Sequence, residues 1–248
     1  MTEPKPGVAA FAAARAEVLA RIADACGRAG RSPSDVTLVA VSKTVDATRL
    51  RDAVAAGLTL LGENRVQEGM AKAAEVPGAR WHLIGPLQSN KARRAVEVYE
   101  SIQSVESVGL AERVDRLARE VRGSGPADRY PVLLQVNVDD DPAKAGFQPE
   151  ALPEALDRCA GFDALEIRGL MTIGRLVQGA DAARPTFAAL RDLAERLRSG
   201  GATLGPELSM GMTEDFEDAI EEGATIVRVG RALFGERPQT SGPLPVVR

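Results

Sequence analysis

The sequence predicts a single (β/α)8 TIM barrel with one extra helix before its first strand. Short apolar runs alternate with segments of helical periodicity along the whole chain. Barrels of this kind commonly reach the length of this chain, 248 residues, as one domain. No internal repeat or change of composition marks a domain boundary. A doubly wound open sheet with fewer strands would produce much the same alternation and remains the alternative.

The first predicted strand is a continuous run of small and aliphatic residues, which suits a parallel strand that is covered on both faces, and seven further short segments alternate with the helices. The expected strands are 38–43, 58–62, 81–85, 101–105, 130–138, 165–171, 207–210 and 226–229. The polar residues that follow them should gather at one end of the barrel, where such folds bind their ligands.

Helical spacing of apolar residues predicts the intervening helices. The expected helices are 8–29, 46–57, 64–73, 88–99, 110–121, 149–160, 187–197 and 214–222. The first precedes every strand and is therefore additional to the barrel. Residues 1–236 should form the domain, and residues 237–248, rich in Pro, Thr, Ser and Gly, should form a flexible tail.

The composition is that of a soluble globular protein, with 44% hydrophobic and 27% charged residues. A net charge of −4 gives no reason to expect nucleic acid as a partner. No apolar run is long enough for a membrane span and no signal peptide is evident, so a cytoplasmic location is expected. With one histidine, His82, and buried thiols expected for Cys26 and Cys159, no metal site is predicted.

Lys43 is the first candidate for chemistry, because it follows a fully apolar strand. Desolvation there would lower the pKa of its amine and favour a Schiff base with a carbonyl compound. A surface lysine or an ion pair at the barrel rim is the alternative interpretation. Further polar or sulfur-containing side chains are expected at the same face of the barrel: Asn64, His82, Asn137, Met171, Ser209 and Arg228.

Two glycine-bearing segments, Ser209–Thr213 and Val229–Gly235, follow the last two strands. In (β/α)8 barrels the loops after strands seven and eight commonly bind phosphate through backbone amides. Either segment alone could simply form a tight turn or a helix cap. A Schiff-base lysine together with a phosphate site suits a sugar-phosphate aldolase or a pyridoxal 5′-phosphate protein. Arg228, unless it forms an ion pair at the rim, favours the second, because an arginine beside a pyridine nitrogen keeps that nitrogen unprotonated.

Six motifs in order resemble those of the pyridoxal phosphate homeostasis proteins, which are single-domain relatives of the alanine racemase N-terminal barrel. They are Leu38–Thr44, Gly62–Glu68, Trp81–Lys91, Gln135–Val138, Gly169–Thr172 and Ser209–Thr213. The resemblance spans residues from about 8 to 236. Their number and length make it specific.

The resemblance implies a cytosolic barrel that holds pyridoxal 5′-phosphate on Lys43 as an internal aldimine. Arg228 would face the pyridine nitrogen, and Asn64 would lie close to the ring. His82 and Met171 would lie behind these residues. The alternative for His82 is a purely structural histidine that is hydrogen-bonded near the end of its strand, and Met171 is expected to pack rather than to take part in chemistry. The phosphate would be bound by Ser209, Gly211, Thr213 and the backbone amides of Gly230 and Arg231.

The chain departs from the family pattern at three places. Arg65 stands where tyrosine is usual, which would change contacts at the pocket rim, and Thr213 stands where serine is commoner. The segment 174–183 differs from the usual loop after strand six.

A racemase of this type needs a second acid or base on the opposite face of its substrate. The only tyrosines, Tyr99 and Tyr130, are expected at a helix end and a strand start, away from the barrel mouth. We therefore expect no catalytic residues and a monomeric carrier that stores pyridoxal 5′-phosphate and passes it to apoenzymes by transient contact. A weak single-domain amino-acid racemase is the leading alternative, and a Schiff-base aldolase is a third.

Overall fold

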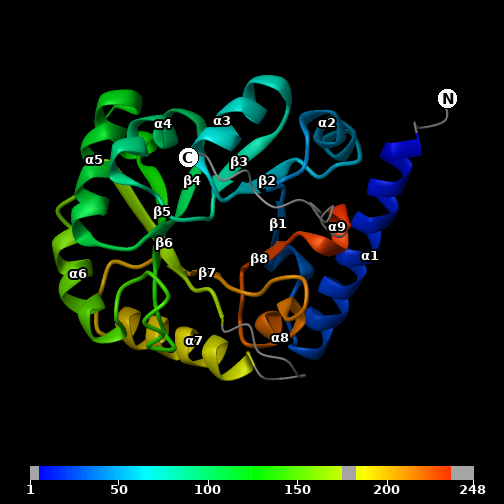
Figure 1. Cartoon of the computed structure of the whole chain (residues 1–248). Coiled ribbons are helices and arrows are strands. Elements are labelled where there is room, and N and C mark those ends of the chain that lie inside the picture. Colours follow the sequence, from blue (N-terminus) through cyan, green and yellow to red (C-terminus); the bar gives the residue numbers. More distant parts are fainter. Residues whose placement is uncertain (1–5, 124, 175–182, 236–248) are drawn as a thin grey trace, which may run out of the picture.

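The barrel is closed by the pairing of the first strand with the last. The structure is a computed structural model that describes residues 6–123, 125–174 and 183–235. Within these residues, eight parallel strands follow one another in sequence order around the barrel, and β1 pairs with both β2 and β8 (Figure 1). The strands are β1 Thr37–Val41, β2 Leu60–Glu63, β3 Arg80–Leu83, β4 Ser101–Val105, β5 Tyr130–Gln135, β6 Leu165–Met171, β7 Glu207–Ser209 and β8 Ile226–Val229. Closure confirms the predicted (β/α)8 barrel and rules out the open sheet.

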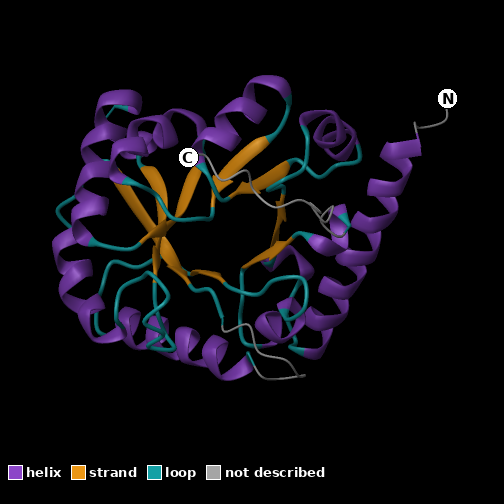
Figure 2. Ribbon diagram, in the orientation of Figure 1, coloured by secondary structure: helices purple, strands orange, loops and turns teal. Residues whose placement is uncertain are grey.

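Helices surround the strands on the outside of the barrel (Figure 2). They are α1 Pro6–Arg28, α2 Ala47–Ala55, α3 Val66–Glu75, α4 Ala92–Val98, α5 Val108–Arg122, α6 Leu152–Cys159, α7 Arg184–Ser199, α8 Phe216–Glu221 and α9 Arg231–Phe234. The helix α1 precedes the first strand, as predicted, and packs along α2, α8 and α9 (Figure 1). Because α9 is a single turn, α1 supplies the cover that a longer last helix would give.

Aromatic contacts attach α1 to α8 and α9. The rings of Phe11 in α1 and Phe234 in α9 meet edge to face, with centroids 5.7 Å apart. The guanidinium of Arg21 in α1 lies 4.6 Å from the ring centroid of Phe216 in α8. Cation–π and edge-to-face contacts of this kind add to the area that the rings bury. The first helix is therefore fixed to segments near the end of the described chain.

Three strands, β4, β6 and β8, have the predicted bounds, whereas β5 is shorter than predicted. The expected strand ran to residue 138, but β5 ends at Gln135. Beyond it the chain pairs with the returning loop instead, through a bridge between Val136 and Phe147. β1 ends at Val41, so Lys43 lies two residues beyond the strand rather than at its last position.

Some expectations fall on parts of the chain that the structure does not describe. The tail 237–248 and residues 175–182 of the loop 174–183 lie outside the described residues. The assignment of residues 1–236 to one domain stays a prediction. In the described parts of the chain, no helix has both the length and the apolar character needed to cross a membrane.

Gly69 on α3 packs closely against Tyr99, the residue that ends α4. A Cβ added at Gly69 would lie 1.9 Å from the hydroxyl oxygen of Tyr99, whose ring is fully buried. That hydroxyl donates to the carbonyl oxygen of Arg65 at 3.1 Å, so the ring has little freedom to move.

We expect Gly69→Ala to lower the free energy of unfolding by about 1–3 kcal/mol, the usual cost of overpacking a filled core. Chemical denaturation would measure the change. The matched control is Gly109→Ala on α5, where an added Cβ meets no atom within 4 Å. The control should be neutral or slightly stabilising, because alanine favours the helix. Equal destabilisation by both changes would contradict the close contact.

Candidate functional site

Lys43 lies just beyond the strand whose alternate side chains line the barrel. Val39 and Val41 belong to the apolar cluster inside the barrel, together with Leu133 of β5. Ser42 is fully buried, and its hydroxyl donates to the carboxylate of Glu63 at 2.6 Å. The chain turns at this point, since the Val45 N–H donates to the Ser42 carbonyl oxygen at 3.0 Å. Lys43 is half-buried in this turn, at the carboxyl end of β1.

A chain of hydrogen bonds crosses the barrel interior from β3 to β8; we call it the interior network. The amide nitrogen of Gln103 lies 2.8 Å from His82 Nδ1, and the amide oxygen of Gln103 accepts from the Ser209 hydroxyl at 2.6 Å. The Ser209 oxygen accepts from Arg228 Nη1 at 2.7 Å. Arg228 Nη2 donates to the carbonyl oxygen of Thr172 at 2.8 Å. The network fixes the guanidinium in one orientation inside the barrel.

Arg228 is a cation inside the barrel, with 4% of its surface exposed. Burial lowers the pKa of its guanidinium to about 10, and the nearby Asp215 carboxylate opposes that shift. The side chain therefore stays charged at neutral pH. A buried charge is tolerated when it is hydrogen-bonded, which the interior network provides.

The loops after β7 and β8 bring three predicted phosphate-binding residues together. Gly211 has φ of +89°, and an added Cβ would lie 2.6 Å from Ala219 Cβ, so only glycine fits there. The hydroxyl oxygen of Thr213 accepts from the backbone N–H of Gly230 at 3.2 Å. Turns that expose backbone amides beside a hydroxyl are suited to oxyanions.

The side chains of two other predicted phosphate residues, Ser209 and Arg231, have partners within the protein. Ser209 is fully buried, and its hydroxyl is already hydrogen-bonded to Arg228 and Gln103. The guanidinium of Arg231 pairs with Glu214 at 2.9 Å on the exposed surface. Phosphate binding by these residues stays a prediction.

The remaining predicted residues divide between the mouth and the core. Asn64 is half-buried directly after β2, and its backbone lies so close to Gly85 that an added Cβ there would be 2.4 Å from the Asn64 carbonyl oxygen. Met171 is fully buried in the interior apolar cluster, which fits packing. The departure at Arg65 is an exposed N-cap of α3, without a side-chain hydrogen bond to the helix.

Sequence reasoning missed two groups of residues. Gln103 joins His82 to Ser209, and Lys72 forms ion pairs with Glu63 at 2.8 Å and Glu68 at 2.7 Å beside Lys43. The spacing of Glu68 and Lys72, four positions apart on a helix, was a signal for a pair. An acid at the end of an apolar strand was the signal for Glu63.

The two tyrosines are buried and engaged with the backbone. Tyr99 is the C-cap of α4 and Tyr130 is the first residue of β5. The Tyr130 hydroxyl donates to the carbonyl oxygen of Tyr99 at 2.8 Å. Burial raises the pKa of both hydroxyls, so neither is suited to proton transfer at neutral pH.

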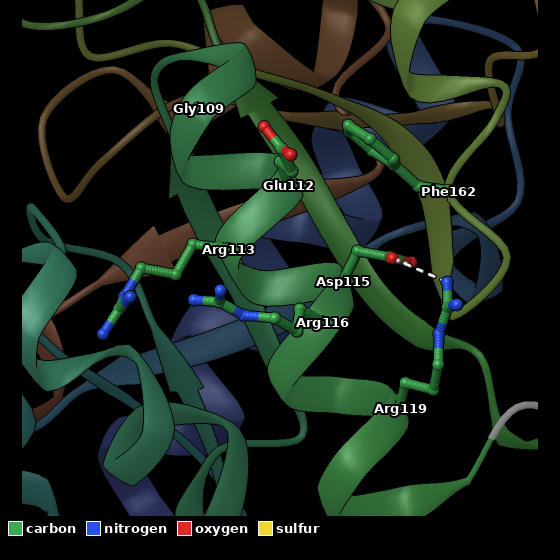
Figure 3. Close-up of a pocket in the computed structure, with 7 residues that line it drawn as sticks. All are labelled: Gly109, Glu112, Arg113, Asp115, Arg116, Arg119 and Phe162. Atoms are coloured by element: carbon green, nitrogen blue, oxygen red, sulfur yellow. Dashed lines mark hydrogen bonds and ion pairs between the residues drawn. The ribbon is translucent and has the colours of Figure 1, made fainter.

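A surface pocket lies away from these residues, along the outer side of α5 (Figure 3). Its lining comprises Gly109, Glu112, Arg113, Asp115, Arg116, Arg119 and Phe162. Asp115 pairs with Arg119 at 2.9 Å and accepts the backbone N–H of Ala164, so its charge has partners within the protein. No predicted site residue lines this pocket, and we assign it no ligand.

Comparison with known proteins places the chain in a family. Residues 18–238 match the family model "Alanine racemase, N-terminal domain". The pyridoxal phosphate homeostasis protein of Pseudomonas aeruginosa is 43% identical over 224 residues, covering 90% of this chain and 94% of that protein. The homologue from Aquifex aeolicus, with the same name, is 40% identical over 89% of this chain and 95% of its own. The chain belongs to the family of pyridoxal phosphate homeostasis proteins. This confirms the resemblance seen in the motifs.

Solved structures of this family share the barrel. PipY of Synechococcus elongatus with pyridoxal phosphate bound has a TM-score of 0.74 at 43% identity, covering 86% of this chain and 100% of PipY. Alanine racemase from Corynebacterium glutamicum has a TM-score of 0.66 at 15% identity, covering 95% of this chain and 63% of the racemase. The likeness to the racemase shows the fold alone. The homologues are named as homeostasis proteins rather than as enzymes.

The chain has one histidine, so every imidazole signal in its NMR spectrum comes from His82, a member of the interior network. Burial, with smaller contributions from Arg80 and Arg168, lowers the pKa of His82 from 6.5 to about 4. We expect the imidazole to titrate near pH 4 in NMR spectra of the folded protein. A titration midpoint near 6.5 would contradict the buried arrangement.

The same shift links stability to pH. Between pH 6.5 and 4 the unfolded chain binds a proton at this ring and the folded protein does not, so stability falls as pH falls through that window. The expected loss is roughly 3 kcal/mol over the window. His82→Asn should lack this dependence, and denaturation at several pH values would compare the two proteins.

Proposed function

We propose that this protein holds pyridoxal 5′-phosphate covalently on Lys43 and takes part in storing and delivering the cofactor. The observation that carries the proposal is a half-buried lysine, Lys43, just beyond β1 at the mouth of a barrel whose interior holds a buried cation, Arg228. The relatives named for pyridoxal phosphate homeostasis and the PipY structure with the cofactor bound support it.

The residues present fit this ligand. The Lys43 amine would attack the aldehyde carbon, form a C=N bond and release the carbonyl oxygen as water. When bound, pyridoxal phosphate supplies an electron sink for carbanion chemistry, and a cation beside its ring nitrogen weakens that capacity. Arg228 is the cation that would do so. Gly211, Thr213 and Gly230 would receive the phosphate at the loops after β7 and β8.

The proposed role is that of a carrier rather than an enzyme. Proton transfer at an amino acid Cα on both faces requires two groups, and neither buried tyrosine can be the second. In this proposal the protein is a cytoplasmic monomer that meets apoenzymes transiently and has no catalytic residues.

One observation favours the alternative of a weak amino-acid racemase. Glu106 follows β4 at the carboxyl end of the barrel, and in the described structure one of its carboxyl oxygens is buried without a hydrogen-bond partner. Burial raises the pKa of this carboxyl, as in acid–base residues of enzymes. Glu106 is the group that would serve as a second acid or base if the protein turned over amino acids.

The covalent proposal predicts a coloured protein. Wild-type protein with pyridoxal 5′-phosphate should show the visible absorbance of a Schiff base, and borohydride reduction should label Lys43 among the five lysines of the chain. Lys43→Ala should lose both signals, whereas Lys91→Ala, which removes an amine from the turn Ser89–Lys91, should keep them. Absorbance spectra and peptide mass spectrometry provide the measurements. A colourless wild-type protein that takes up no cofactor would reject the proposal.

Deuterium exchange at the Cα of alanine separates carrier from racemase. We expect the cofactor-loaded wild-type protein to exchange no faster than free pyridoxal 5′-phosphate, because in the carrier proposal no second acid or base acts together with Lys43. Exchange followed by NMR would be compared with Lys43→Ala and Glu106→Gln. Robust exchange in the wild-type protein that both substitutions abolish would show that the protein acts on amino acids as a racemase does, and would reject the carrier proposal.

A further inference from the structure

The backbone on both sides of Lys43 is held by one group of charges, the buried Glu63 and Lys72 and the partly exposed Glu68, which we call the Lys72 cluster. On the side before Lys43, the Lys72 ammonium donates to the Ser42 carbonyl oxygen at 2.8 Å, and the Ser42 hydroxyl donates to Glu63 at 2.6 Å. On the side after it, the Thr44 backbone N–H donates to Glu68 at 2.8 Å.

Thr44 needs such support because its backbone is strained. Its φ is +68°, a conformation that costs a β-branched residue free energy. Among non-glycine residues in the described ranges, only Thr44 and Asp140 have positive φ. Strained residues persist where surrounding contacts determine their conformation, and they gather at functional sites. The contact of Glu68 with the Thr44 N–H is such a contact.

The cluster is itself rigid because it is enclosed. Glu63 is fully buried, and the Lys72 side chain is 10% exposed. Lys72 contributes three hydrogen bonds, to Glu63, Glu68 and Ser42. One Glu63 oxygen, Oε2, is buried without a partner in the described structure, so the carboxylate depends on Lys72 and Ser42 for its stabilisation. Removing either partner of a buried pair is costly, so the cluster holds a single arrangement.

We propose that the Lys72 cluster positions Lys43, fixing Ser42 and Thr44 so that the amine is directed into the barrel mouth and can form its covalent bond. This inference rests on the proposed function. Glu63, Glu68 and Lys72 are positioning residues, because their contacts reach the backbone and the Ser42 hydroxyl on either side of Lys43. Orientation of the two reacting atoms governs the rate of such a bond-forming step.

Covalent attachment of the ligand to Lys43 and recognition of its ring and phosphate make different demands on the protein. The amine nitrogen must reach the aldehyde carbon, expel the oxygen as water and give up two protons. A ligand that lacks the aldehyde needs none of this and would be bound through its ring and phosphate alone. The cluster should therefore govern how fast pyridoxal 5′-phosphate becomes attached, and it should leave the affinity for pyridoxine 5′-phosphate, which carries an alcohol instead, unchanged.

Glu68→Ala is the primary test, because it removes the acceptor for the Thr44 N–H and leaves Lys72 paired with Glu63. We expect attachment to Lys43, followed by absorbance and by borohydride trapping, to slow about tenfold, the equivalent of one hydrogen bond to a charged group. Affinity for pyridoxine 5′-phosphate should match the wild type. Glu75→Ala, an exposed glutamate on the same helix, is the matched control and should attach at the wild-type rate.

Rescue distinguishes positioning from general stability. Glu68→Gln keeps an oxygen that can accept the Thr44 N–H and should recover most of the lost rate. Lys72→Met should slow attachment more than Glu68→Ala, and thermal unfolding of each variant would identify any that fail to fold. Because Glu68 is partly exposed, Glu68→Ala keeps the test decisive even if Lys72→Met does not fold.

The outcomes separate the two proposals. A wild-type protein that is not labelled at Lys43 would reject the proposed function and the inference with it. Labelled wild type with equally fast attachment in Glu68→Ala would reject the inference alone. Parallel loss of affinity for both ligands in Glu68→Ala would also overturn it, because a structural defect would then explain the result.

Discussion

Pairing of β1 with β8 is the constraint on which the rest of the molecule depends. Four residue pairs join the two strands, from Thr37 with Ile226 to Ala40 with Val229. Most of the chain lies between these two strands, so pairing them costs chain entropy. That cost is offset only when the intervening strands have assembled. Once it forms, the carboxyl ends of all eight strands surround one opening. Lys43 and Arg228, far apart in sequence, then share one interior.

The barrel interior is filled by two kinds of contact. Apolar side chains such as Leu133 and Met171 pack inside it, as is common in barrels of this class. The interior network adds polar groups that must each be satisfied, since an unpaired buried donor costs more than a hydrogen bond gains. The network therefore specifies one arrangement of Arg228 as well as filling space. A cation held in this way can influence a ligand without moving to meet it.

The sequence was a good guide to the barrel and a partial guide to the site. β4, β6 and β8 were predicted residue for residue, because in each a short segment with regularly placed aliphatic residues lies between two segments of helical periodicity. β5 was predicted too long, since a bridge to Phe147 replaces sheet pairing beyond Gln135, and local pattern does not reveal that partner.

Hydrogen bonds between residues on different strands of the barrel could not be predicted from local sequence pattern. The hydrogen bond from Ser209 to Gln103 joins residues 106 positions apart, and it depends on strand register and on which face each side chain occupies. The hydrogen bonds of the Ser209 hydroxyl with Gln103 and Arg228 could not be foreseen from its position before a loop, and its part in phosphate binding stays a prediction. The Lys72 cluster, in contrast, was local and carried a signal, since Glu68 and Lys72 lie four positions apart on one helix; its contacts with Ser42 and Thr44 depend on how the chain turns after β1.

The position of α1 has a consequence for how the protein is made. This helix is synthesised before all eight barrel strands, yet it packs against α8 and α9, which flank the last of them, β8. Its apolar side chains, including Phe11, are fully covered only after α8 and α9 have been synthesised. Domains synthesised from the N-terminus expose such surfaces to aggregation and to chaperones while they wait. The arrangement therefore makes the nascent chain dependent on protection until the last strand has emerged.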